Sequence, residues 1–152
     1  MSCFRDKMNI INIDNIEKAK QLIKTAQAPI IVKAQNEEFN RKILEYGKFD
    51  IILSLEKENL RNKIRQTNSG LNHVLAKIAS KNKISIGFDL EEIKKMEIKQ
   101  KAEILSKIKQ NIKICRKYNT KLSIKTKNLQ EAKNFLTGLG ASNKQASETI
   151  VF

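Results

Sequence analysis

The chain has 152 residues, enough for one domain with a single buried core, and it carries 30 Lys and Arg against 16 Asp and Glu, a formal net charge of +14. A positive field of this size attracts polyanions and argues against small cationic substrates, so nucleic acid is the leading class of partner. The two cysteines, Cys3 and Cys115, lie far apart without CxxC spacing, which argues against a zinc site or a disulfide framework.

Short β-branched runs alternate with helical patterns along the chain. The expected strands are residues 8–13, 29–34, 49–55, 84–90 and 121–126. The expected helices are residues 14–28 with Asp14 as the cap, residues 37–47, a segment from Leu71, a long basic segment ending near Tyr118, and residues 128–136. Residues 142–152 close the chain and are expected to form one helical turn.

This alternation predicts right-handed βαβ units and a parallel sheet. Five such units are too few for a closed eight-stranded barrel, which takes about 250 residues, so the sheet is either an open doubly wound sheet or an incomplete barrel. Residues 8–13 and 121–126 would then be free edge strands. Because an open edge pairs readily with another chain, we expect self-association or a need for a partner subunit, unless the N-terminal segment or residues 149–152 cover an edge.

No linker or segment of low complexity divides the chain, so residues 1–152 are expected to form a single domain. No apolar run approaches the roughly 18 residues that span a bilayer, and the N-terminus lacks the apolar region of a signal peptide. We therefore expect a cytoplasmic protein that does not associate with a membrane and that holds no metal or cofactor.

The segment SGLNHVLAKIASKNK, residues 69–83, contains the one histidine of the sequence at the start of an expected helix. Its apolar residues recur at helical spacing and predict a buried face formed by Leu71, Val74, Leu75, Ile78 and Ala79. His73, Lys77 and Lys81 fall on the opposite face, which argues against a core histidine. A single His without a cysteine cluster also argues against a metal site.

The beginning of this helix offers free backbone N–H groups and the positive end of the helix dipole. Asn68 and Ser69 precede the helix, and His73 and Lys77 lie one turn apart within it. These four residues are candidates for a corner that binds a phosphate of RNA. The alternative is a simple helix cap with solvated side chains.

Basic residues are concentrated in the second half of the chain. Residues 94–127 contain twelve Lys and Arg and two acids. The long helix combines an apolar seam with a basic stripe: the seam is Leu105, Ile108, Ile112 and Cys115, and the stripe is Lys109, Lys113, Arg116 and Lys117. Further candidate RNA contacts precede and follow these helices: Arg61, Lys63, Arg65, Lys125 and Lys127. The alternative for the stripe is an ordinary solvated helix face.

Residues for catalysis are not apparent in the sequence. We find no nucleophile beside a base, no Gly-rich phosphate loop and no HExxH. Asp89 and Glu91 are the nearest candidates for a carboxylate pair at a strand end. The chain is therefore expected to have no catalytic residues of its own.

Two segments resemble the archaeal and eukaryotic ribonuclease P protein component 3 family: SGLNHVLAKIASKNKISIGFDL and IKQNIKICRKYNTKLSIKT. In that family, D-S-G-[LI]-[ND]-H-V-L-A-[KR] precedes a strand, and N-[LI]-x-[LIV]-[AC]-R-K-Y is followed by one. Residues 68–77 and 111–118 match these motifs, with Asn68 in the place of the usual acid. His73 and Lys77 take the places of the His and the basic residue, and Arg116 and Lys117 those of the R-K pair.

The resemblance implies an α/β fold in which parallel βα units form a partial, N-terminally shortened TIM-barrel-like structure of about five strands. It implies an RNA-binding subunit that supports a catalytic RNA in removing the 5′ leader of precursor tRNA. The expected partners are the ribonuclease P RNA, precursor tRNA and a second small protein subunit, the Pop-five homologue. Two alternatives remain open: a metal-dependent phosphoesterase of the related barrel superfamily, and a scaffold that has kept only a protein interface.

Overall fold

A computed structural model describes residues 10–57 and 69–152 of the chain. These residues contain six strands: β1 (Ile10–Ile11), β2 (Ile31–Lys33), β3 (Ile51–Leu53), β4 (Ser85–Asp89), β5 (Leu122–Lys125) and β6 (Ile150–Val151). All neighbouring strands are parallel, and their order in the sheet is their order in the sequence. A doubly wound sheet reverses its strand order at a switch point, whereas this sheet does not. The structure therefore confirms the partial barrel.

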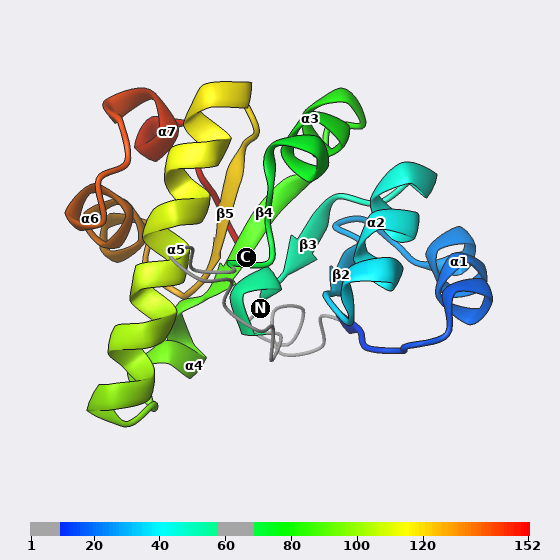
Figure 1. The fold of residues 1–152 in the computed structure, drawn as a ribbon, viewed down its shortest axis with the longest axis horizontal. Coiled ribbons are helices and arrows are strands. Elements are labelled where there is room, and N and C mark those ends of the chain that lie inside the picture. The colour runs from blue at the N-terminus through cyan, green and yellow to red at the C-terminus, as the bar shows by residue number, and fades with distance from the viewer. Residues whose placement is uncertain (1–9, 58–68) are drawn as a thin grey trace.

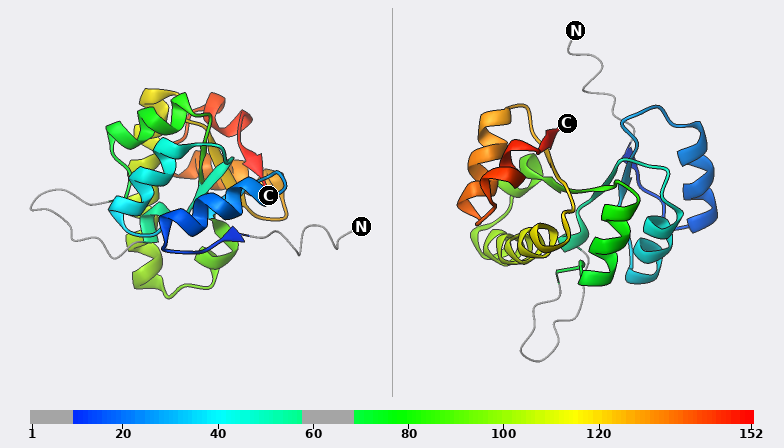
Figure 2. Two further views of the ribbon diagram at one scale, coloured as in Figure 1. Left: turned by 90° about the vertical axis from the view of Figure 1, so that its right-hand side faces the viewer. Right: turned by 90° about the horizontal axis from the view of Figure 1, so that it is seen from above.

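The helices lie on the outer side of the curled sheet, as in a barrel (Figures 1 and 2). They are α1 (Ile16–Thr25), α2 (Glu37–Tyr46), the short 3₁₀ helix η2 (Leu55–Lys57), α3 (His73–Lys81), α4 (Leu90–Lys94), α5 (Ile98–Tyr118), α6 (Leu129–Gly138) and α7 (Asn143–Ser147). None of the described helices is long and apolar enough to cross a membrane.

The end of the chain forms a sixth strand, which the sequence pattern does not predict. The amide of Phe152 donates to the carbonyl of Ile124 over 3.1 Å, and the amide of Thr126 donates to the carbonyl of Phe152 over 3.2 Å. Residues 121–126 are therefore not an edge strand, and that expectation was wrong. The alternative that the last residues cover this edge is confirmed.

Two expected helix boundaries also differ from the structure. The cap of α1 is Asn15 rather than Asp14, because the Asn15 side chain accepts hydrogen bonds from the amides of Glu17 and Lys18. The long basic helix is preceded by the separate helix α4, which is capped by Asp89. The side chains of Asn15 and Asp89 thus set the start of two helices.

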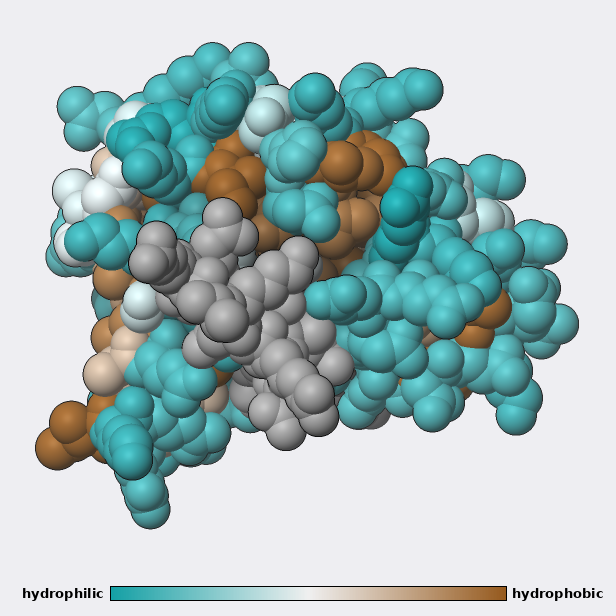
Figure 3. Space-filling model, in the orientation of Figure 1, coloured by the Kyte–Doolittle hydropathy of each residue, from teal (hydrophilic) through white to brown (hydrophobic). Residues whose placement is uncertain are grey.

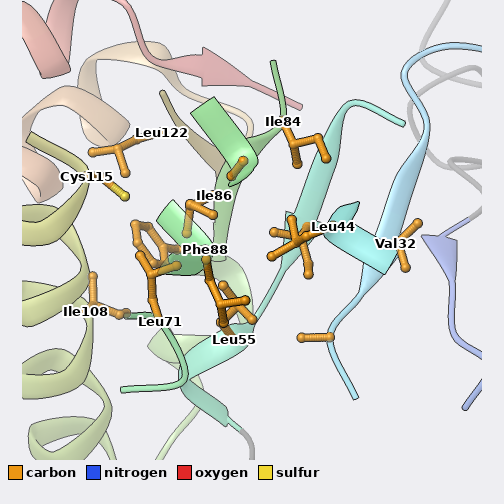
Figure 4. Packing of buried hydrophobic residues seen from close by; sticks show 14 of the residues in the cluster. Val32, Leu44, Leu55, Leu71, Ile84, Ile86, Phe88, Ile108, Cys115 and Leu122 are labelled. Carbon is orange, nitrogen blue, oxygen red and sulfur yellow. The ribbon is translucent and has the colours of Figure 1, made fainter. Parts of the chain in front are cut away.

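The main core lies between the sheet and the helices (Figure 4). Ile86, Phe88 and Leu122 of the sheet face the helices, where Ile108 and Cys115 of α5 meet them. Successive side chains of a strand point to opposite faces, so the remaining strand residues form the inner face of the half-barrel.

The inner face carries a small second cluster of Ile31, Ile51 and Leu53, against which Ile10 and Phe152 pack. Phe152 follows β6, whereas Ile51 and Leu53 belong to β3, three strands away. In a flat sheet that separation would be about 14 Å. Packing between these side chains therefore shows that the sheet is strongly curled.

Candidate nucleic-acid interface

The two motif segments of the sequence meet in the structure, because α3 packs against α5. The buried side-chain amide of Asn111 donates to the backbone carbonyl of Ser69 over 3.1 Å. Two residues beyond the end of α5, the Thr120 hydroxyl donates to the carbonyl of Ala76 over 2.9 Å. Buried hydrogen bonds of this kind fix how the two helices lie against each other.

Gly70 adopts a conformation that only glycine fits. Its φ is +81°, and a Cβ at this position would lie 2.2 Å from the carbonyl oxygen of Leu55. The chain enters α3 through this close approach to η2, and Asn72 then caps the helix by accepting a hydrogen bond from the amide of Leu75 over 2.9 Å. The Gly of the first motif therefore sets the path of the chain into α3.

One residue of the predicted phosphate-binding corner, Ser69, lies in the core. Ser69 is only 1% exposed, and its hydroxyl donates to the carbonyl of Leu71. The phosphate contact predicted for Ser69 therefore does not fit its placement in the core. The helix begins at His73 with Asn72 as its cap, and Asn68 lies outside the described residues.

The outer face of α3 carries the basic residues that the sequence placed there. His73, Lys77 and Lys81 are exposed. The predicted buried face was partly wrong, because Val74 is 39% exposed while Ala76 is fully buried. Since α3 packs against both α2 and α5, its buried side is shifted toward Ala76.

Tyr118 lies where the two basic helix faces approach each other. The Nζ atom of Lys77 is 5.3 Å from the centroid of the Tyr118 ring, and that of Lys117 is 5.5 Å from it. A tyrosine ring attracts cations to its face. Tyr118 therefore contacts a basic side chain from α3 and a neighbouring one from α5.

The long helix α5 has the expected seam and stripe. Ile108, Ile112 and Cys115 are buried and Leu105 is half-buried, whereas Lys109, Lys113, Arg116 and Lys117 are exposed. The Arg116 side chain turns away from the other basic residues of the stripe: its Nη1 donates to the carbonyl of Gly140 in the α6–α7 loop over 3.3 Å. Lys109, Lys113 and Lys117 stay exposed on α5, and Lys117 shares the Tyr118 ring with Lys77 of α3.

We call this surface the α3–α5 basic surface. It consists of His73, Lys77, Lys81, Lys109, Lys113 and Lys117. Within residues 10–57 and 69–152, no carboxylate lies at ion-pairing distance from any of its lysines. Figure 3 shows hydrophobic patches among the hydrophilic side chains over α3 and the upper part of α5. Unpaired cations beside apolar surface suit a nucleic acid, which offers phosphates and bases together.

Lys125 and Lys127 lie apart from this surface. α5 leads into the start of β5, whereas Lys125 ends that strand. The Nζ atom of Lys125 is 3.4 Å from a carboxylate oxygen of Asp89; Asp89 is buried and Lys125 is half-buried. The structure therefore does not join Lys125 to the other predicted contacts, although Lys127 is exposed.

The carboxylates at the strand ends are held by other side chains. Glu91 accepts a hydrogen bond from the Thr126 hydroxyl over 3.0 Å and pairs with Lys94, which also contacts Glu131. The hydrogen bond with Glu131 raises the pKa of Lys94. Among the described residues, no three His, Cys, Asp or Glu side chains are grouped so as to hold a metal ion.

Three further predicted contacts cannot be placed. Arg61, Lys63 and Arg65 lie outside the described residues. Conversely, sequence reasoning did not select Asn111, Tyr118 or Thr120 as site residues. Asn111 and Tyr118 are the first and last residues of the second motif. Their place in the motif could have identified them as site residues.

No family model matches the chain. It is 26% identical over 113 residues to Ribonuclease P protein component 3 of Methanococcus vannielii, covering 74% of this chain and 46% of that protein. It is 33% identical over 93 residues to the Methanosarcina acetivorans protein of the same name, covering 61% of this chain and 36% of that protein. The chain thus spans about half the length, or less, of these curated relatives.

A solved structure has the same fold. A chain in a cryo-EM structure of archaeal Ribonuclease P with mature tRNA superimposes with a TM-score of 0.76 at 20% sequence identity, covering 91% of this chain and 62% of that chain. The relatives and this fold agree with the resemblance of the two motifs. The chain is therefore a homologue of archaeal Ribonuclease P protein component 3.

Proposed function

We propose that this chain is an RNA-binding protein subunit of a ribonuclease P, in which a catalytic RNA removes the 5′ leader of precursor tRNA. The observation that carries the proposal is the α3–α5 basic surface, whose lysines have no carboxylate partners among the described residues. The names of the curated relatives support the assignment to ribonuclease P.

The proposed mechanism is electrostatic. The lysines of the α3–α5 basic surface neutralise phosphates of the folded RNA and release condensed counterions, which favours the compact active form of the RNA. Lys77 and Lys117 both contact the Tyr118 ring, which limits how far each side chain can move before it meets a phosphate. The chemical step is left to the RNA and its metal ions.

The proposed partners are the ribonuclease P RNA, precursor tRNA and the Pop-five homologue as a second protein subunit. The particle, rather than this chain, would be the nuclease, and we propose that it acts in the cytoplasm. A scaffold that contacts only protein would not need unpaired lysines on two adjoining helices. The phosphoesterase alternative has no supporting observation, because Asp89 and Glu91 are both bound to other side chains.

Reconstitution of the particle tests this function. Single-turnover cleavage of precursor tRNA at low magnesium concentration is measured with the RNA and the other protein subunits, with and without this chain. We expect the chain to raise the rate, because lysine–phosphate contacts replace part of the magnesium that the RNA needs to fold. An unchanged rate at saturating chain concentration, with the chain bound to the particle, would contradict the proposal.

A further inference from the structure

Three lysines lie at the end of the half-barrel where the strands begin. The helices α2, α3 and α5 end at this side, and β3, β4 and β5 start there; in Figure 1, α5 ends and β5 begins at the upper side of the molecule. The three connections contain Lys48, Lys83 and Lys121, which are all exposed. We call them the strand-start lysines. None of them belongs to the α3–α5 basic surface, although Lys81 of that surface is only two residues from Lys83.

The three connections are neighbours in space, because β3, β4 and β5 are neighbours in the sheet. The amide of Ser85 donates to the carbonyl of Asp50 over 2.9 Å, and the amide of Ile86 donates to the carbonyl of Lys121 over 2.9 Å. Adjacent parallel strands lie about 4.8 Å apart. The strand-start lysines therefore form a row across the end of the sheet.

Hydrogen bonds between neighbouring units hold these connections in place. The side-chain amide of Asn82, beside Lys83, donates to the carbonyl of Leu44 in α2 over 2.7 Å. The Ser80 hydroxyl of α3 donates to the carbonyl of Asn119 in the next connection over 3.4 Å. The backbone of the row is thus tied to the folded helices on both sides.

Two of the strand-start lysines have a left-handed backbone. Lys48 has a φ of +61° and Lys83 a φ of +57°, a conformation that glycine and asparagine adopt at lower cost than lysine. Near other helix ends the chain places Gly47, Asn119 and Gly140 in positive φ, at +68°, +55° and +96°. The turn by itself therefore does not account for lysine at positions 48 and 83, and a strained position of this kind points to a role for the side chain.

The charge of the row is not neutralised within the described residues. No carboxylate there lies within ion-pairing distance of a strand-start lysine. Asp50 is the single acid of the three connections, and its Oδ2 accepts a hydrogen bond from the amide of Ile30 over 2.7 Å. The Nζ atom of Lys48 lies 5.4 Å from the centroid of the Tyr46 ring, a cation–π contact that keeps its charge.

A row of unpaired lysines suits a linear polyanion. An RNA strand carries a phosphate at every nucleotide, and lysine binds phosphate as a point charge rather than reading the edge of a base. The only aromatic residue in the three connections is Phe49, which is buried and offers no ring for stacking on a base. Contacts made here would therefore be to phosphates.

We propose that the strand-start lysines bind the phosphate backbone of an RNA strand that crosses the starts of β3, β4 and β5. The contact is independent of base sequence. The inference rests on the proposed function and extends it, because the RNA then passes from the α3–α5 basic surface around the end of α3 onto a second face of the half-barrel.

The variant Lys48→Asn/Lys83→Asn separates the charge from the backbone turn, because asparagine adopts the left-handed conformation readily. We expect affinity for ribonuclease P RNA to fall about 30-fold at 0.15 M salt, since two phosphate contacts contribute about 1.8 to the slope of log affinity against log salt concentration. The melting temperature should be unchanged or higher. Filter binding across a salt series and thermal unfolding measure the two effects.

The matched control is Lys18→Gln/Lys99→Gln, which removes the same net charge from exposed positions in the first turns of α1 and α5. These turns lie at the opposite end of the half-barrel, so the control should lose clearly less affinity. Equal affinity of the asparagine variant and this control would overturn the proposal. So would binding of the parent to phosphatidylserine vesicles that the asparagine variant loses while its affinity for RNA is unchanged.

Failure of this inference and failure of the proposed function give different results. If Lys109→Glu/Lys113→Glu/Lys117→Glu loses affinity for the RNA and Lys48→Asn/Lys83→Asn does not, the strand-start contact alone is wrong. If the chain binds RNA through the strand-start lysines but leaves cleavage of precursor tRNA by the particle unchanged, the proposed function fails and the strand-start contact stands.

Discussion

Reversal of Lys109, Lys113 and Lys117 to Glu is expected to weaken binding to ribonuclease P RNA on the order of 100-fold at 0.15 M salt. Each lysine–phosphate contact adds about 0.9 to the slope of log affinity against log salt concentration, so three contacts account for roughly two log units at this concentration. The new carboxylates add repulsion. Filter binding across a salt series measures both the loss of affinity and the smaller slope.

The fold should survive this change, because all three side chains are exposed and none belongs to the buried seam of α5. Circular dichroism checks this directly. The matched control is Lys18→Glu/Lys24→Glu/Lys95→Glu, which alters the net charge equally at exposed positions outside the α3–α5 basic surface. If both variants lose affinity to the same extent, the effect comes from net charge and the α3–α5 basic surface has no special role.

Replacement of Gly70 by Ala is expected to lower the free energy of unfolding by about 2 to 4 kcal/mol. The added Cβ would meet the carbonyl oxygen of Leu55 at 2.2 Å, and the φ of +81° is unfavourable for alanine. Neither strain can be relieved by rotating a side chain, because the opposing atom belongs to the backbone. Urea unfolding followed by circular dichroism gives the change.

Gly138→Ala is the matched control for this variant. A Cβ at Gly138 meets nothing within 4 Å, and the residue lies in α6. Alanine is a better helix former than glycine, so this variant should be as stable as the parent or more stable by up to about 1 kcal/mol. Equal stability of Gly70→Ala and the parent would show that the segment before α3 is not held against η2.

The architecture followed from local patterns, because each strand core from β1 to β5 is a short apolar run between helical patterns. The sixth strand was not predicted from the sequence, and the reason is physical. Ile150–Val151 is only two residues long, and it is held by pairing with β5 rather than by its own periodicity. The long-range pairing that closes this edge is not visible in a sequence window.

The candidate site was only partly predictable. Helical spacing correctly predicted that Lys77, Lys109 and Lys113 are exposed, because an apolar seam on one side of a helix determines which residues face water. Ser69 is buried beside Asn111, which is distant in the sequence and donates to the Ser69 carbonyl, so local spacing does not predict its burial.

Contact between RNA and the α3–α5 basic surface is tested most directly by lysine acetylation of the chain, free and bound to ribonuclease P RNA, with mass spectrometry of each site. We expect RNA to protect Lys77, Lys109, Lys113 and Lys117, while the exposed Lys18 reacts equally in both states. Unchanged acetylation of these four lysines in an RNA-bound sample would contradict the central claim, and protection of Lys18 alone would place the RNA on another face.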